Sequence, residues 1–250
     1  IEGNITQINV SRNGFVSIVM SNTSYKSIID GYDRSGKGIF KTNLVTARVA
    51  DISISQDSKY LAIAEVDLSG IIISSGIQIV SIELAQTDPE KAMLYKYEAP
   101  KDKLIMNIEY QEQNKLVCMY NDSIEILQDK TSNKIQKLED QKLSFMTIEL
   151  NDRIALLEEV STGDYTADTK VSIVNPETLK EKQYISKDVA KAIETSQNKI
   201  AINFGTESHI ISKNGILLKK YISDIEINEM VMAEGIIGIV YKDKIQIINL

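Results

Sequence analysis

The chain has 250 residues, a formal net charge of −7, one cysteine, one histidine and no tryptophan. One cysteine excludes an internal disulfide, and one histidine excludes a histidine-rich metal site. The acidic balance, without a basic stripe, disfavours nucleic acid and anionic membrane surfaces as partners.

Isoleucine is unusually frequent, with 40 of the 250 residues. Its branched side chain suits a pleated, half-buried surface, so this bias favours β-sheet. Apolar and polar residues also alternate with a period of two along most of the chain, which is the pattern of strands with one buried face. We therefore expect an all-β protein with little helix.

The alternation is organised in six successive hairpins. The first joins residues 6–10 to residues 15–19 through Asn13-Gly14, a dipeptide typical of tight hairpin turns. The second turns through residues 55–59, and four more follow. The first strands of the six hairpins align on one apolar position each: Ile8, Ile52, Ile108, Ile148, Ile193 and Met230.

A third strand is predicted after each hairpin, and a fourth strand follows a turn-rich link in the first five copies. The third strands are expected near residues 25–32, 76–84, 123–128, 169–175, 208–213 and 244–249. The fourth strands are expected near residues 38–44, 92–98, 134–139, 179–185 and 216–222, with a helical turn at residues 88–97 as the alternative to a strand there.

Four-stranded repeats of about 40–45 residues are the sequence pattern of β-propeller blades. One blade cannot bury both of its faces, whereas a ring of blades covers each face with a neighbour. We predict a single six-bladed propeller domain over residues 1–250, with a β-sandwich as the alternative. The blades are expected at residues 3–44, 46–99, 103–140, 143–186, 188–223 and 224–250.

The sixth blade ends on its third strand, so its outer strand is expected to come from elsewhere. Residues upstream of Ile1 are the natural donor. Without them, the isoleucine-rich strand at residues 244–249 is an exposed edge, and such edges recruit other strands. We accordingly expect a monomer or a weak oligomer paired through this edge.

The turn segments of the chain resemble those of the WD40-like and YVTN-like β-propeller superfamily. The resemblance is carried by residues 32–37 and by residues 55–62, which have the pattern S-x-D-x-K-Y-L-A. The chain departs from true WD40 repeats because it has no Trp-Asp or Gly-His pair. It also resembles a family of bacterial membrane-anchored propellers without an established activity, which implies an extracytoplasmic domain with an anchor outside this segment.

His209 and Cys118 are the residues most able to do covalent or acid–base chemistry, and both are expected to be structural. His209 begins a third strand, and no G-x-S-x-G motif accompanies it, so we expect a strand-edge histidine. Cys118 lies in an apolar strand, so we expect a buried thiol that does not react.

Two groups of carboxylates are candidates for cation binding. Asp164 and Asp168 lie in a polar loop with oxygens at alternate positions, which suits calcium, although no bidentate glutamate follows. Glu109, Glu149 and Glu194 follow the aligned apolar residue of three consecutive hairpins and are expected at one level of a central channel. A solvated loop and a hydrated channel are the alternatives, and we expect no cofactor and no tightly held metal.

A second polar layer is predicted on the same face of the innermost strands, two residues before these glutamate positions. Its members are Gln7, Asp51, Asn107, Thr147, Ala192 and Glu229.

Function is expected to reside in loops, since a propeller is a rigid scaffold with loops at both ends. The long segments at residues 65–76, 86–103 and 158–170 are the candidate contact surface. We predict a non-catalytic protein-interaction or scaffold module, not an enzyme. The alternative is a hydrolase or a cation- or ligand-binding propeller that uses channel carboxylates, and the lack of tryptophan platforms counts against the hydrolase.

Overall fold

The computed structural model describes residues 3–11, 13–101, 103–111, 114–121, 123–128, 131–137, 142–147, 153–162, 166–175, 178 and 180–250. The chain divides into two compact units, residues 1–138 and residues 139–250. Each unit consists of small antiparallel sheets, and each is described here by itself.

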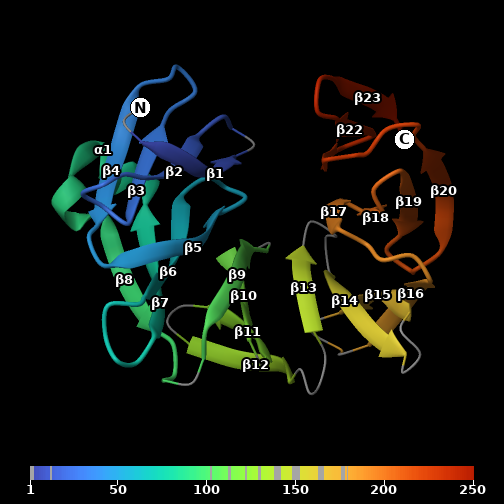
Figure 1. Cartoon of the computed structure of the whole chain (residues 1–250). Coiled ribbons are helices and arrows are strands. Elements are labelled where there is room, and N and C mark those ends of the chain that lie inside the picture. The colour runs from blue at the N-terminus through green and yellow to red at the C-terminus, as the bar shows by residue number, and fades with distance from the viewer. Residues whose placement is uncertain are drawn as a thin grey trace. The chain divides into compact units, whose positions relative to one another are not determined.

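The first unit contains three four-stranded sheets in which neighbouring strands are joined as hairpins (Figure 1). Its first sheet holds β1 (Asn4–Val10), β2 (Val16–Ser21), β3 (Ser27–Tyr32) and β4 (Gly38–Leu44). Its second sheet holds β5 (Ala47–Ile54), β6 (Tyr60–Asp67), β7 (Ser74–Ser81) and β8 (Met93–Glu98). Its third sheet holds β9 (Ile105–Tyr110), β10 (Leu116–Tyr120), β11 (Ser123–Gln128) and β12 (Thr131–Lys137).

The second unit contains two four-stranded sheets and one of three strands. The fourth sheet of the chain holds β13 (Lys142–Thr147), β14 (Ile154–Thr162), β15 (Thr166–Val174) and β16 (Glu181–Ser186). The fifth holds β17 (Ala192–Ser196), β18 (Lys199–Asn203), β19 (Glu207–Ser212) and β20 (Leu217–Ile222). The sixth holds β21 (Glu229–Ala233), β22 (Ile236–Val240) and β23 (Ile245–Asn249).

Within each unit, consecutive sheets pack face to face, because successive side chains of a strand point to opposite faces. On β6, Leu61 and Ile63 pack with the first sheet, whereas Ala62 and Ala64 pack with the third. In the second unit, Ile200 and Ile202 of β18 likewise join the fourth sheet, and the intervening Ala201 joins the sixth. The middle strands of a sheet therefore contribute to two cores at once, which explains their nearly continuous apolar sequences.

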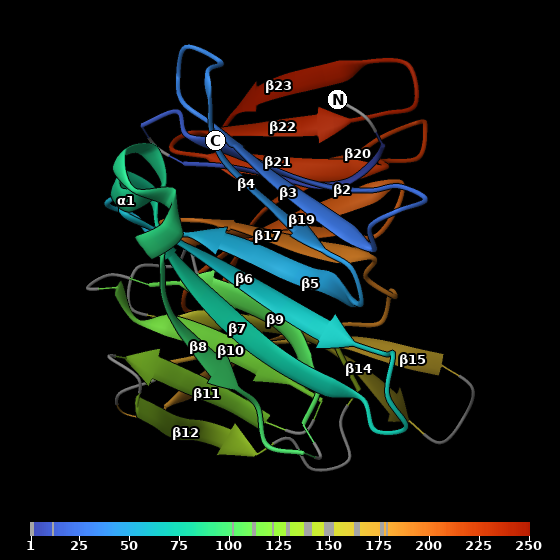
Figure 2. The same cartoon turned by 90° about the vertical axis from the view of Figure 1, so that its left-hand side faces the viewer.

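The predicted strands are confirmed to within a few residues, with two corrections. The long loop predicted at residues 158–170 is mostly strand, because β14 runs to Thr162 and β15 begins at Thr166. The third strand expected to run to residue 84 ends at Ser81, and the helix α1 (Ile82–Thr87) and a 3-10 turn (Pro89–Lys91) follow before β8. The Ser81 hydroxyl accepts a hydrogen bond from the Leu84 amide at 3.2 Å and caps the helix. Figure 2 shows α1 beside the first sheet, where Ile82 and Ala85 are buried in the core.

The sixth sheet has three strands among the described residues, as the sequence predicts. No helix in the described part of the chain is long and apolar enough to cross a membrane.

Candidate functional site

A cleft of about 580 Å³ lies in the first unit, between the end of the first sheet and the second sheet. One wall is formed by residues 43–47, which lead from β4 into β5. The other is formed by the β6–β7 hairpin, and residues 96–101 of β8 and the following loop complete the lining. Two of the three long segments predicted to form a contact surface therefore line one cleft.

The side chains in the cleft combine fixed charge with apolar surface. Glu65 is nearly buried, forms an ion pair with Lys96 and accepts a hydrogen bond from the Gln78 amide at 2.8 Å. Asp67 accepts hydrogen bonds from the hydroxyl of Thr46 at 2.8 Å and from the Ser69 amide at 2.8 Å. The Thr46–Asp67 bond ties the hairpin to the segment between β4 and β5, and the Glu65–Lys96 pair ties it to β8, so the cleft has a defined polar wall.

The tip of the β6–β7 hairpin is apolar and exposed. The exposed fractions are 54% for Leu68, 106% for Ile71, 64% for Ile72 and 51% for Ile73. The hairpin projects beyond the end of the second sheet (Figure 2), and Ile72 and Ile73 also line the cleft. Grouped apolar side chains on a surface mark interaction sites more often than isolated ones do. The sequence signal is a run of three isoleucines after Gly70, because adjacent side chains of an extended segment cannot all face one core.

A buried carboxylate, Asp51, joins the innermost strands of all three sheets of the first unit. Its Oδ1 accepts hydrogen bonds from the Gln7 amide of β1 at 2.5 Å and from the backbone N–H of Ile52 at 2.8 Å. Its Oδ2 accepts from the Asn107 amide of β9 and from the backbone N–H of Ile108 at 2.9 Å. Gln7, Asp51 and Asn107 belong to the predicted second polar layer, so the structure confirms that these three positions meet.

Local irregularities of the backbone orient the side chains of Gln7 and Asp51. The pairing register shifts between Ile5 and Gln7 in β1 and between Val49 and Asp51 in β5. An extra residue in one strand re-aims the side chain that follows it. Burial raises the pKa of Asp51 to about 6, against the hydrogen bonds from Ile108, Gln7 and Ile52, which favour the ionised form. The arrangement is a buried acceptor that holds the three sheets of the first unit together.

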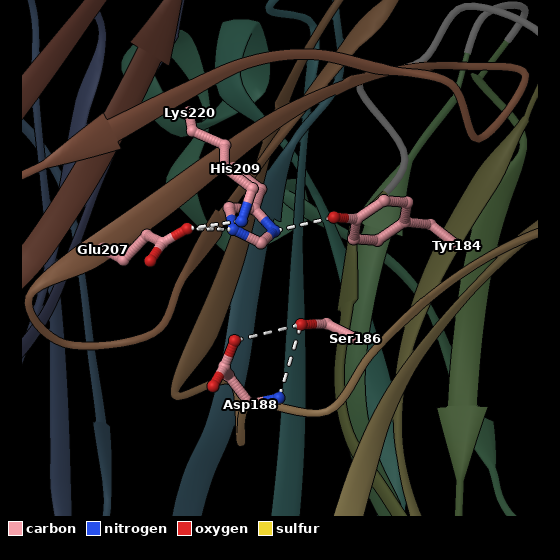
Figure 3. A network of polar contacts seen from close by, with 6 residues as sticks. All are labelled: Tyr184, Ser186, Asp188, Glu207, His209 and Lys220. Carbon is pink, nitrogen blue, oxygen red and sulfur yellow. Dashed lines mark hydrogen bonds and ion pairs between the residues drawn. The ribbon is translucent and has the colours of Figure 1, made fainter.

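His209 is at the centre of a polar network in the second unit (Figure 3). Its Nδ1 lies 2.7 Å from the hydroxyl of Tyr184, and its Nε2 lies 2.6 Å from Oε1 of Glu207. Lys220 donates to the same Glu207 oxygen at 2.7 Å and, with His209, lowers the pKa of that carboxyl. In the neutral ring Nε2 carries the proton, because a carboxylate can only accept, and Nδ1 then accepts from the tyrosine.

The predicted position of His209 at a strand edge is wrong. The residue lies in β19, paired with Ile202 on one side and Lys220 on the other, and is 2% exposed. The Phe204 ring packs against it, with ring centroids 4.5 Å apart. His209 lies near the start of its strand, as expected, but the strand is an inner one, and Glu207 provides the acceptor that burial of the imidazole requires. The network joins β16 to β19 and β20 and is closed to solvent at the imidazole, which suits a structural role.

The other predicted site residues are dispersed over the two units. Glu109 lies on β9 of the first unit and Glu194 on β17 of the second. Glu149 and Asp164 lie outside the described residues, and for Asp168, on β15, the backbone alone is described. The level of the three channel glutamates therefore remains a prediction. The prediction that Asp168 lies in a loop is wrong, because β15 begins at Thr166 and pairs Asp168 with Val160 of β14, and calcium binding by Asp164 and Asp168 remains a prediction. Among the described residues, no group of three or more His, Cys, Asp or Glu side chains is arranged to hold a metal ion.

Cys118 is fully buried in β10, as predicted. Burial raises the pKa of its thiol well above the ordinary value, so the nucleophilic thiolate is suppressed.

Solved structures with this architecture are β-propellers. The β-propeller domain of the Trilobed protease from Pyrococcus furiosus has a TM-score of 0.69 at 14% identity, over 98% of this chain and 81% of that one. Hsv2p from Kluyveromyces lactis has a TM-score of 0.65 at 14% identity, over 98% and 74%. For the dihydro-heme d1 dehydrogenase NirN these values are 0.65 and 10%, over 98% and 54%, so this chain spans about half the length of NirN.

No curated protein matches the sequence. The structural likeness, at these identities, shows the fold, which is a β-propeller. The whole of residues 1–250 matches one sequence family, and the chain belongs to it: the Family of unknown function (DUF5711).

Proposed function

We propose that this protein is a non-catalytic interaction module that binds a protein partner through the cleft and the apolar tip of the β6–β7 hairpin. The observation that carries the proposal is the exposure of Leu68, Ile71, Ile72 and Ile73 beside a cleft of about 580 Å³. Burying such side chains against a partner removes apolar surface from water and stabilises the complex. The Glu65–Lys96 ion pair and the Asp67 hydrogen bonds hold the wall of the cleft in place.

The partner that fits this surface presents an apolar segment with polar groups at its margin. The hairpin tip supplies the apolar centre of the interface, and Glu98 and Lys101 of the cleft lining supply charges at its margin. This division into an apolar centre and a polar rim is that of ordinary protein–protein interfaces.

A photo-crosslinking residue placed at Ile72 tests the proposal in the cells that encode the protein. We expect a reproducible protein adduct at Ile72 and none at Ile216, an equally exposed isoleucine of the second unit. The purified partner is then expected to bind the double variant I71S/I72S at least about tenfold more weakly, because two apolar anchors are lost. The control variant I216S/L218S, whose side chains are also exposed, is expected to bind as the unmodified protein does.

Three results would overturn the proposal. They are equal crosslinking at Ile216, unchanged affinity of I71S/I72S, and insertion of the hairpin into vesicles of zwitterionic lipid in place of protein binding. The last is measured by co-sedimentation of the same two variants with vesicles.

We further propose that the six sheets are the blades of one propeller domain over residues 1–250. The solved propellers cover nearly the whole chain, which supports this assignment. One domain is expected to unfold in a single cooperative transition, with the same midpoint when followed by far-UV circular dichroism and by tyrosine fluorescence. Two separated transitions would contradict it.

The location that we propose is the extracytoplasmic face of a bacterial membrane, with an anchor outside this segment. The proposal rests on the resemblance to membrane-anchored propellers. Protease added to intact cells is expected to degrade the domain, while a cytoplasmic marker protein stays intact. Protection of the domain until the cells are lysed would refute this location.

A further inference from the structure

The outer edge of the sixth sheet differs from that of the other five. In each four-stranded sheet the third strand is covered by a fourth, whereas among the described residues the sixth sheet ends at β23. Its backbone N–H and C=O groups on that side form an edge to which another strand can add.

The sequence of β23 is that of a covered strand. Ile245-Gln246-Ile247-Ile248 nearly repeats Ile77-Gln78-Ile79-Val80 of β7, the third strand of the second sheet. On β7, the two isoleucines are buried in the core shared with the third sheet and lie opposite Tyr97 and Tyr95 of the fourth strand, β8. On β23, the corresponding Ile245 and Ile247 are 68% and 71% exposed.

The charges on the outer strands show the same contrast. Lysine on an edge strand opposes pairing with a further strand, because pairing would desolvate its ammonium group. Each of the five fourth strands carries lysine, and β23 has no charged residue. The lysines on the five fourth strands include Lys41, Lys96, Lys134, Lys182 and Lys219.

We propose that a second copy of this chain adds its own β23 to this edge, antiparallel and about a twofold axis. The incoming strand must have an open edge, no charge, and apolar side chains on the face of Ile245 and Ile247. The β23 strand of a second copy meets these conditions by its own sequence.

The register that buries most apolar surface is centred on Gln246. It sets Ile245 opposite Ile247 of the partner subunit, and Ile247 opposite Ile245 of the partner subunit. The apolar face then runs across the seam from Val231 and Ile236, which share it through the pairing of β21, β22 and β23. A seam of one short strand pair is smaller than the interfaces of stable dimers, so the association is weak and depends on concentration.

Sedimentation velocity over about a hundredfold range of protein concentration tests the proposal. The unmodified protein is expected to shift from monomer toward dimer. The variant I247K, which gives β23 the lysine that the other outer strands have, is expected to stay monomeric. Its circular dichroism and melting temperature should be unchanged, because Ile247 is exposed.

The matched control is I185K on β16. Ile185 is 60% exposed, and its strand is the outer strand of a four-stranded sheet and already carries Lys182. This variant is expected to dimerise like the unmodified protein. The proposal is overturned if the unmodified protein is monomeric throughout, if I247K still dimerises, or if I185K loses the dimer as well.

Discussion

Asp51 gives the stability of the protein a pH dependence of unusual sign. Its pKa is about 6 in the folded protein and 3.8 in an unfolded chain, so the folded state holds a proton more tightly. Between these values the folded protein binds more protons than the unfolded chain, and its stability falls as the pH rises. The stabilisation is complete below pH 3.8 and is lost as the pH passes through about 6. A difference of roughly two pKa units corresponds to about 3 kcal/mol.

The variant D51N isolates this contribution. Asparagine replaces one carboxylate oxygen with an NH2 group, so two donors of the network lose their acceptor, which costs about 1–3 kcal/mol for each donor at every pH. It does not titrate, so the difference in unfolding free energy between D51N and the unmodified protein is expected to move by about 2 kcal/mol in favour of D51N between pH 4 and pH 7. Urea denaturation of both proteins at four or more pH values measures this difference.

The control is D33N. The Ser35 hydroxyl and the Lys37 amide donate to the exposed Asp33 and lower its pKa, so its contribution has the opposite sign and disappears as the pH falls. A gap between D51N and the unmodified protein that stays constant within about 0.5 kcal/mol would refute the reasoning. So would a gap that moves in the same direction as that of D33N.

Three further predictions concern buried groups. E125A removes the Glu125 carboxylate that pairs with the ammonium group of Lys103 and is expected to cost about 3 kcal/mol in urea denaturation, whereas the double variant K103M/E125L recovers most of the loss; an equal cost in both variants would contradict this. C118A is expected to cost about 1 kcal/mol, and the native thiol should react with a thiol reagent far more slowly than free cysteine; fast labelling of the folded protein would contradict the burial. Y184F removes one hydrogen bond to His209 and is expected to cost about 1 kcal/mol with no change in the fold seen by circular dichroism, and a neutral result would show that the bond contributes nothing.

Much of the fold could be predicted because its signals are local. Alternating strands and turn residues can be recognised within short segments, such as Asn13-Gly14 before β2. The six repeats of this pattern strengthen the prediction of each strand. The helix α1 was missed because Ser81-Ile82-Glu83-Leu84 continues the period of two. Its cap is the Ser81 hydroxyl, and its stability depends on Ile82 and Ala85 meeting the core of the neighbouring sheet. Tertiary packing of this kind is absent from the local pattern.

The sites were less predictable than the fold. Aligning the hairpins placed Gln7, Asp51 and Asn107 in one layer, but the alignment could not reveal that Asp51 is buried and accepts from both neighbours. The partners of His209 come from β16 and β20, and their distances in the chain carry no periodic signal. Which polar residues meet depends on how neighbouring sheets pack, and the sequence of one strand does not determine this.

The hydrogen bonds of Asp51 also bear on how this chain avoids misfolding. Its strands are short and rich in isoleucine, so many wrong pairings between them would bury nearly as much apolar surface as the correct ones. A shift of β5 by one residue would turn Asp51 to the opposite face, away from the donors on β1 and β9, and bury a carboxylate without partners. An exchange of strands between two copies of the chain would also bury the Asp51 carboxylate without hydrogen-bond partners, unless the exchanged strands supplied the same donors. One acidic residue therefore favours the correct order and register of three sheets. The apolar residues alone do not distinguish the correct strand pairing from the wrong ones.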